Sequence, residues 1–109
     1  MSLSSKVDIP WNEEGPRVRG DGEETEVQVR SWHASIVGGA LCLAAYGWKI
    51  KKDGTPGAYN THVPVRAEDM PSLVLADLLA GLAVAERAQR AELDACAAVL
   101  AQVMGGASC

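Results

Sequence analysis

The stretch that decides the fold is EVQVRSWHASIV-GG-ALCLAAYGWKI, which runs from Glu26 to Ile50. Two strand-like runs flank the pair Gly38-Gly39, and a two-residue type I′ loop needs positive φ at both positions, which glycine adopts without a Cβ clash. The sequence predicts a β-hairpin whose partner numbers sum to 77, so that Val29 faces Trp48. A helix is the alternative, because apolar residues also recur at spacings of three and four, but each interior glycine costs about 1 kcal/mol relative to alanine.

Alternation along the two strands assigns their side chains to two faces. One face is mostly apolar, and it carries Val27, Val29, His33, Val37, Cys42, Tyr46, Trp48 and Ile50. The other face is basic with one large aromatic residue, and it carries Gln28, Arg30, Trp32, Lys49 and Lys51. The basic face is therefore the first candidate for a binding surface.

Two further elements are expected after the hairpin. Residues 51–57 are rich in turn formers and predict a loop, and alternation from Tyr59 to Arg66 predicts a third strand, which Pro64 places at an edge or a bulge. From Asp69, the expected N-cap, the apolar period changes to between three and four, which predicts an amphipathic helix that stops at Gly105-Gly106. The expected fold is α+β, an antiparallel three-stranded β-ribbon followed by a long C-terminal helix.

The length of this helix raises the question of what covers it. A helix that continues to Met104 has about 35 residues and a length of about 50 Å, which is more than a three-stranded ribbon covers. Its polar centre, residues 86–92, is either a solvated bridge or a break between two helices. The distal apolar residues need a partner, and the same helix of a second copy is the most economical one. We expect a homo-oligomer, a dimer first, whose interface contains Leu93, Cys96, Leu100 and Val103.

Residues 1–25 are polar and contain two prolines and three glycines. They predict a flexible N-terminal arm that precedes one α+β domain of residues 26–109. Val7, Ile9 and Trp11 alternate with polar residues, so a short edge strand, or an arm that docks on a partner subunit, is the alternative. The chain has 109 residues, 48% of them hydrophobic, which is the size of one small domain.

The formal net charge of −4 is unevenly distributed. Residues 1–26 carry three basic and seven acidic groups, and residues 67–109 carry two basic and six acidic groups, so each segment sums to −4. Residues 27–66 carry five basic groups and one acidic group and sum to +4. The acidic total argues against a general polyanion binder, whereas a local basic field still favours an anion on one surface.

The three cysteines, Cys42, Cys96 and Cys109, are odd in number and lack a CxxC spacing. We therefore expect reduced thiols, and neither a disulfide framework nor a zinc ribbon. Neither a signal-length nor a membrane-spanning apolar run is present, so a cytoplasmic location without membrane association is expected. The absence of Phe and the abundance of Ala, Gly and Val are typical of a GC-rich genome, such as that of an actinobacterium or one of its phages.

Three segments resemble a known family when they are taken in order. They are VQVR at residues 27–30, YGWKIKKDG at residues 46–54 and HVPVRAEDMP at residues 62–71. Over roughly residues 27–82 the chain is similar to the PC4-type transcriptional coactivator domain and its prokaryotic and phage relatives. The resemblance implies a curved antiparallel sheet with a C-terminal helix, which dimerises and binds single-stranded DNA across the sheet face. The chain departs from the family where a basic, glycine-containing run enters the last strand, because residues 60–63 read NTHV here.

The basic face also suggests nucleic-acid binding without reference to a family. A single strand requires cations spaced along a groove and aromatic planes for its bases, and Trp32 with Tyr46 or Tyr59 would supply the planes. The expected nucleic-acid-binding residues are Arg30, Trp32, Lys49, Lys51, Lys52 and Arg66. The alternative is a solvated face that discourages edge pairing or serves a protein partner. The chain would then be an assembly module, such as a small phage structural or anti-host protein, that docks through its long helix and N-terminal arm.

Catalysis and metal binding are not expected. His33 and His62 do not have, with Cys42 or Cys96, the spacing of a nucleophile–base pair or a metal site, and Cys42 is expected to be a small core residue. Gly38-Gly39 lacks the strand-to-helix context of a phosphate-binding loop. We expect a non-enzymatic protein that uses no cofactor.

Overall fold

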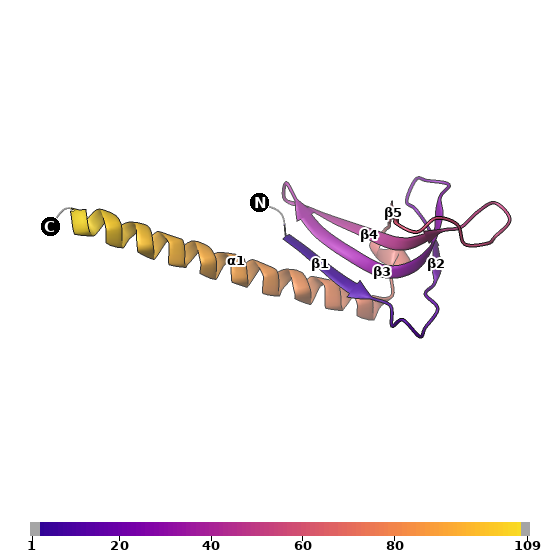
Figure 1. Cartoon of the computed structure of the whole chain (residues 1–109), viewed down its shortest axis with the longest axis horizontal. Helices are drawn as coiled ribbons and strands as arrows, with labels where there is room; N and C mark the ends of the chain where they lie inside the picture. The colour runs from indigo at the N-terminus through magenta and orange to yellow at the C-terminus, as the bar shows by residue number, and fades with distance from the viewer. Residues whose placement is uncertain (1–2, 108–109) are drawn as a thin grey trace.

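The computed structural model describes residues 3–107, and the side chains of residues 3–104. An antiparallel five-stranded sheet is followed by one long helix, which confirms the α+β prediction and adds two strands to it (Figure 1). The elements are β1 (Leu3–Asp8), β2 (Arg17–Arg19), β3 (Glu26–Val37), β4 (Ala40–Lys49), β5 (Thr61–Pro64), the 3-10 turn η1 (Ala67–Asp69) and α1 (Ser72–Ala107). No helix in this part of the chain is both long enough and apolar enough to cross a membrane.

The sheet is built around the predicted hairpin of β3 and β4. Gly38 and Gly39 form its turn with φ angles of 58° and 80°, as a type I′ loop requires. β5 pairs with β4, and both β1 and β2 pair with the opposite edge of β3, β1 along its C-terminal half and β2 along its N-terminal end.

Residues 3–8 and 17–19 of the segment expected to be a flexible arm form strands β1 and β2, as in the edge-strand alternative. Leu3, Ser5 and Val7 alternate with exposed residues and turn toward α1, so β1 closes an edge of β3 that would otherwise leave backbone groups unpaired. Both strands therefore belong to the same sheet as the hairpin.

A bulge in β3 changes which residues share a face. The pairs from Ser31 with Tyr46 to the turn follow the predicted sum of 77, but Arg30 is an extra residue, and Val29 pairs with Gly47 instead of Trp48. Because a bulge reverses the alternation of side chains, Val27 and Val29 lie on the same face as Trp32 and Ala34. Gly47 permits this geometry, since a Cβ at that position would lie 1.9 Å from the carbonyl oxygen of Gln28.

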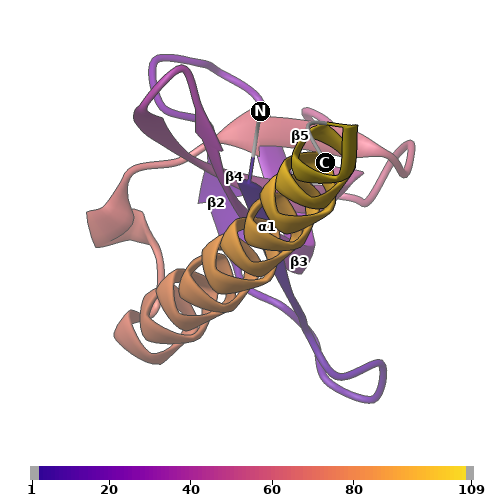
Figure 2. The same cartoon turned by 90° about the vertical axis from the view of Figure 1, so that its left-hand side faces the viewer.

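One face of the sheet packs against α1, and Figure 2 shows the helix crossing it. Gly81 allows a close approach to β1, because a Cβ there would lie 2.2 Å from Ser5 Oγ. In the described part of the chain, the opposite face has no helix over it. The buried core consists of Val27, Val29, Trp32, Ala34, Ala45, Val63, Val65, Met70, Leu78 and Leu82.

The helix continues far beyond the sheet (Figure 1). α1 is unbroken through residues 86–92, where Arg90 Nη2 and Glu86 Oε1 lie 2.7 Å apart, so the alternative of two helices is wrong. It begins at Ser72, with Asp69 in η1 instead of at the N-cap, and it passes through Gly105-Gly106 to Ala107 instead of stopping there. The molecule is consequently elongated, with extents of 74 × 24 × 23 Å.

Candidate functional site

The sheet face opposite α1, here called the outer face, carries a continuous group of aromatic rings. This ring cluster consists of His33 from β3, Tyr46 and Trp48 from β4, Tyr59 from the loop before β5, and His62 from β5. The centroid distances are 5.9 Å for His33–Tyr46, 5.7 Å for His33–His62, 4.3 Å for Tyr46–His62, 5.2 Å for Tyr46–Tyr59 and 4.9 Å for Trp48–Tyr59. These pairs are edge-on or tilted, and edge-on contacts are among those that aromatic rings prefer.

The position of the cluster follows from the bulge. His33, Tyr46 and Trp48 were expected on the core face with Val27 and Val29, but the reversed alternation places them outside. His62 and Tyr59 are exposed, and the other three rings are half-buried. Partial burial, followed by the neighbouring His62 and Lys6, holds the pKa of His33 below its ordinary 6.5, although Asp8 opposes this shift.

Arg30, the bulged residue, connects the cluster to the segment between β1 and β2. Its guanidinium lies over the ring of Trp48, 5.9 Å from the centroid, which is a cation–π distance. Its Nη2 and Nη1 donate to the carbonyl oxygens of Ile9 and Glu13 at 3.1 and 3.0 Å. The predicted place of Arg30 on a binding face fits this geometry, but two of its N–H groups already have protein partners.

A hollow lies beside the cluster, between the rings and the segment from Ile9 to Trp11. Its cavity volume is about 530 Å³. Its lining includes four rings of the cluster, Lys6, Arg30 and Trp11, whose side chain stays 89% exposed at the rim. The hollow combines aromatic surfaces with two cations and one carboxylate, because Asp8 also lines it and its Oδ1 lies 3.3 Å from Lys6 Nζ.

Trp32 is not part of this face, and its predicted role in stacking is wrong. The side chain is 0% exposed and belongs to the core. The prediction assumed unbroken alternation from Gln28 to Trp32, and the bulge at Arg30 moves Trp32 to the side of α1. Trp48 takes the aromatic position that the sequence assigned to Trp32.

Lys49, Lys51 and Lys52 lie together at the end of β4 and in the following turn, and all three are exposed. Lys49 pairs with Val27, and because paired residues project from the same face, it leaves the sheet on the α1 side and not beside Arg30. The turn is held by hydrogen bonds from Lys51 N to Thr55 O at 2.9 Å and from Gly54 N to Lys51 O at 2.9 Å. Lys51 and Lys52 thus carry exposed positive charge in the turn after β4, whereas Lys49 lies on the α1 side.

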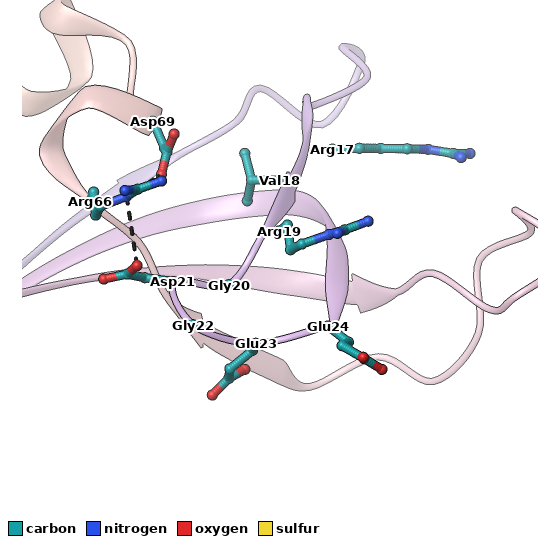
Figure 3. A pocket seen from close by; sticks show the side chains of 10 residues that line it. All are labelled: Arg17, Val18, Arg19, Gly20, Asp21, Gly22, Glu23, Glu24, Arg66 and Asp69. Atoms are coloured by element: carbon teal, nitrogen blue, oxygen red, sulfur yellow. Dashed lines mark hydrogen bonds and ion pairs between the residues drawn. The ribbon is translucent and has the colours of Figure 1, made fainter.

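Arg66 was expected to contact nucleic acid, but the structure places it in a separate hollow among carboxylates (Figure 3). Its Nε lies 3.6 Å from Asp21, 3.3 Å from Glu68 and 3.5 Å from Asp69. Figure 3 shows the Arg66 side chain reaching between Asp21 and Asp69, whereas Arg17 and Arg19 extend away from them. The charge of Arg66 is therefore balanced locally, and Arg66 joins η1 to the loop after β2.

The residues predicted for an oligomer interface are solvent-exposed on the distal part of α1. Leu93 is 52% exposed, Leu100 59% and Val103 65%, and the thiol of Cys96 is free. Cys42 is also a free, exposed thiol on the outer face and not the core residue that was expected, whereas Cys109 lies outside the described residues. Among residues that the structure describes, no three histidine, cysteine, aspartate or glutamate side chains form a group able to hold a metal ion.

Comparison with known proteins adds no relative: no family model matches the chain, and neither a curated protein nor a solved structure matches it significantly.

Proposed function

We propose that the chain binds single-stranded nucleic acid, DNA or RNA, on the outer face, with the ring cluster as a stacking platform. The observation that supports this most directly is the continuous chain of five neighbouring rings on the sheet face opposite α1. Three of the rings are half-buried and two are exposed, and neighbouring aromatic side chains gathered on one surface are typical of a binding site.

The physical basis is base stacking combined with attraction of phosphates. Each base stacked on an aromatic side chain contributes about 1–3 kcal/mol, and every base has a flat face, so sequence preference is weak. Arg30 lies beside the rings, Lys6 lies there in an ion pair with Asp8, and Lys51 and Lys52 are exposed in the turn after β4. From the PC4-type resemblance the proposal takes only the expectation that the ligand lies across the sheet. The exposed thiols of Cys42 and Cys96 suit a reducing compartment, so we place the activity in the cytoplasm.

Fluorescence anisotropy with labelled single-stranded oligonucleotides at several salt concentrations tests the proposal. Tyr59→Ala should weaken binding about 5- to 150-fold without changing the salt dependence, because stacking releases few counterions. Lys51→Ala with Lys52→Ala should reduce the slope of log K against log salt by about 0.7 for each phosphate that is no longer neutralised. Arg87→Ala, which removes an exposed charge from the part of α1 beyond the core, is the matched control and should bind like the unmodified chain.

The absence of binding at low salt, where electrostatic attraction is strongest, would contradict the proposal that the chain binds nucleic acid. Equal affinity for double-stranded and single-stranded DNA would also contradict it, since the bases of a duplex are stacked on each other and not available to the rings.

The distal half of α1, residues 91–104, supports a second candidate function, that of an assembly module. All of its side chains are exposed, among them Leu93, Val99, Leu100, Val103 and Met104. We propose that a second copy of the chain covers this surface. Leu93, Cys96, Leu100 and Val103 have the alternating three- and four-residue spacing of a helix–helix seam, and residues 95–104 contain no charged side chain that would repel an identical helix.

Sedimentation analysis over a range of concentrations tests this association. Leu100→Glu with Val103→Glu should shift the chain to the monomer, because the new carboxylates would have to be buried without partners in an apolar seam. Ala98→Glu, on the opposite side of the helix, is the matched control and should leave the mass unchanged. A chain that is monomeric at every concentration before any substitution would contradict the proposal.

A further inference from the structure

The segment that joins β1 to β2 contains a tryptophan that the folded core does not use. Trp11 is 89% exposed, although every other tryptophan in the described chain is at least half-buried. Hydrogen bonds hold this segment in place, so the exposed indole does not belong to a mobile loop.

Arg30 holds the loop at both ends. The amide of Ile9 donates to the Arg30 carbonyl oxygen at 2.8 Å, and the Arg30 guanidinium donates to the carbonyl oxygens of Ile9 and Glu13. Between them the amide of Glu13 donates to the carbonyl oxygen of Pro10 at 2.9 Å, which closes a four-residue turn with Trp11 in its second position. The indole is thus presented from a turn of fixed conformation.

The fixed turn and the ring cluster both line the hollow. Pro10 and Trp11 line it from the turn, while Tyr46, Tyr59 and His62 line it from the sheet side. A volume of about 530 Å³ is within the range of small-ligand sites, roughly 300–1,000 Å³. Flat aromatic walls suit a flat ligand, and because Lys6 at the same hollow is paired with Asp8, the rings provide the main attraction.

We infer that this hollow binds one unpaired nucleobase of the nucleic acid, with Trp11 covering the base from the side opposite the ring cluster. The inference rests on the proposed function and assigns to Trp11, which the sequence did not place among the binding residues, a direct contact with the ligand. Arg30 is then a positioning residue, because it acts by holding the turn that presents Trp11.

The test measures the affinity of the full-length chain for a labelled oligothymidylate by fluorescence anisotropy, at fixed salt. Trp11→Ala should weaken binding about 5- to 150-fold, the range expected when one base loses its aromatic partner, and Trp11→Phe should restore part of that affinity because a phenyl ring still stacks. Asn12→Ala is the matched control: it changes the neighbouring exposed residue of the same turn and should bind like the unmodified chain. Because Trp11 is exposed, these variants should keep their unfolding transitions.

A second readout reports on Trp11 itself. Adding unlabelled oligothymidylate should protect the intrinsic fluorescence of the unmodified chain from iodide quenching, and this protection should be smaller in Trp11→Ala, which keeps only the half-buried Trp48 on the binding face. Arg30→Ala should weaken binding and lower the protection from iodide toward that of Trp11→Ala, because the turn that presents Trp11 is no longer held.

The outcomes separate the inference from the proposed function. If Trp11→Ala binds as tightly as Asn12→Ala, the inference is overturned, while binding by the unmodified chain still supports the function. If Trp11→Phe is as weak as Trp11→Ala, the ring is not the contact, and the inference is overturned as well. If the unmodified chain does not bind the oligonucleotide, both the inference and the proposed function are overturned.

Discussion

The two halves of α1 have the same apolar pattern and opposite surroundings. Leu75, Leu82, Gln89, Cys96 and Val103 are spaced by seven residues along the whole helix, and all but Gln89 are apolar. In the first half this stripe packs on β1 and β3, where Leu82 is 5% exposed and its neighbour Leu78 is 0% exposed. In the distal half the same stripe faces solvent. An amphipathic pattern therefore predicts a helix and the face it presents, but not what covers that face.

The distal half can stay helical without a partner because of how helices form. Nucleation of the first turn is the unfavourable step in helix formation, and packing on the sheet stabilises the first half, which provides this nucleus. Each further residue then adds one hydrogen bond, and the distal half is rich in alanine, the best helix former. Helix continuity and apolar exposure are thus compatible in a single copy of the chain.

The largest expected effect distinguishes a buried from an exposed leucine on the same helix. Leu78→Ala should lower the free energy of unfolding by about 2–5 kcal/mol, because it leaves a cavity under the sheet. Leu100→Ala should change it by less than about 0.5 kcal/mol at concentrations where the chain is monomeric, since this side chain is 59% exposed. Denaturant titration monitored by tryptophan fluorescence measures both values. Equal decreases would show that the two halves unfold as one packed unit.

How much the sequence predicted depends on whether a feature is local. Gly38-Gly39 predicted the hairpin turn because positive φ is a property of the turn residues themselves. The long helix was predicted from its period, and it is continuous although its polar centre left a break open. The edge strands β1 and β2 were predicted as an arm, because their stability comes from pairing with β3 and not from their own residues.

The site was predicted less well than the fold, and the bulge is the reason. The apolar residues of β3 change phase, from Val27 and Val29 to Trp32, Ala34 and Ile36, and this shift was the available signal for an extra residue at Arg30. Without an extra residue at Arg30, the predicted alternation placed Trp32 on the exposed face and Trp48 on the core face. Tyr59 and His62 join the cluster through tertiary structure alone, so no local pattern indicated their contact with Tyr46.

An intermediate effect comes from one glycine substitution made in each half of the helix. Ala80 and Ala98 are both exposed, and glycine costs about 1 kcal/mol relative to alanine in a helix interior. Ala80→Gly should lower the global free energy of unfolding by that amount, because the first half unfolds with the sheet. Ala98→Gly should lower helical circular dichroism while leaving the denaturation midpoint of the monomer unchanged, since the distal half can fray alone. A shifted midpoint in Ala98→Gly would contradict independent fraying.

The smallest expected effect concerns the ion pair where the two halves meet. Glu86 and Arg90 are an i,i+4 pair 2.7 Å apart, with side chains 55% and 73% exposed. Pairs of this kind contribute about 0.3–0.5 kcal/mol to a helix, and salt screens them because both groups are in water. A double-mutant cycle of Glu86→Ala and Arg90→Ala, with stability measured at low and high salt, isolates the coupling from the effect of each side chain.

If the cooperative unit extends through residue 90, the coupling should appear in the global free energy of unfolding at low salt and disappear at high salt. If the unit ends before residue 86, the coupling should be zero in that measurement and should appear only in a cycle that follows helical circular dichroism. The cycle thus locates the point along α1 where packing on the sheet stops contributing to its stability, and a coupling that persists at high salt would show that the pair is less solvated than its exposure indicates.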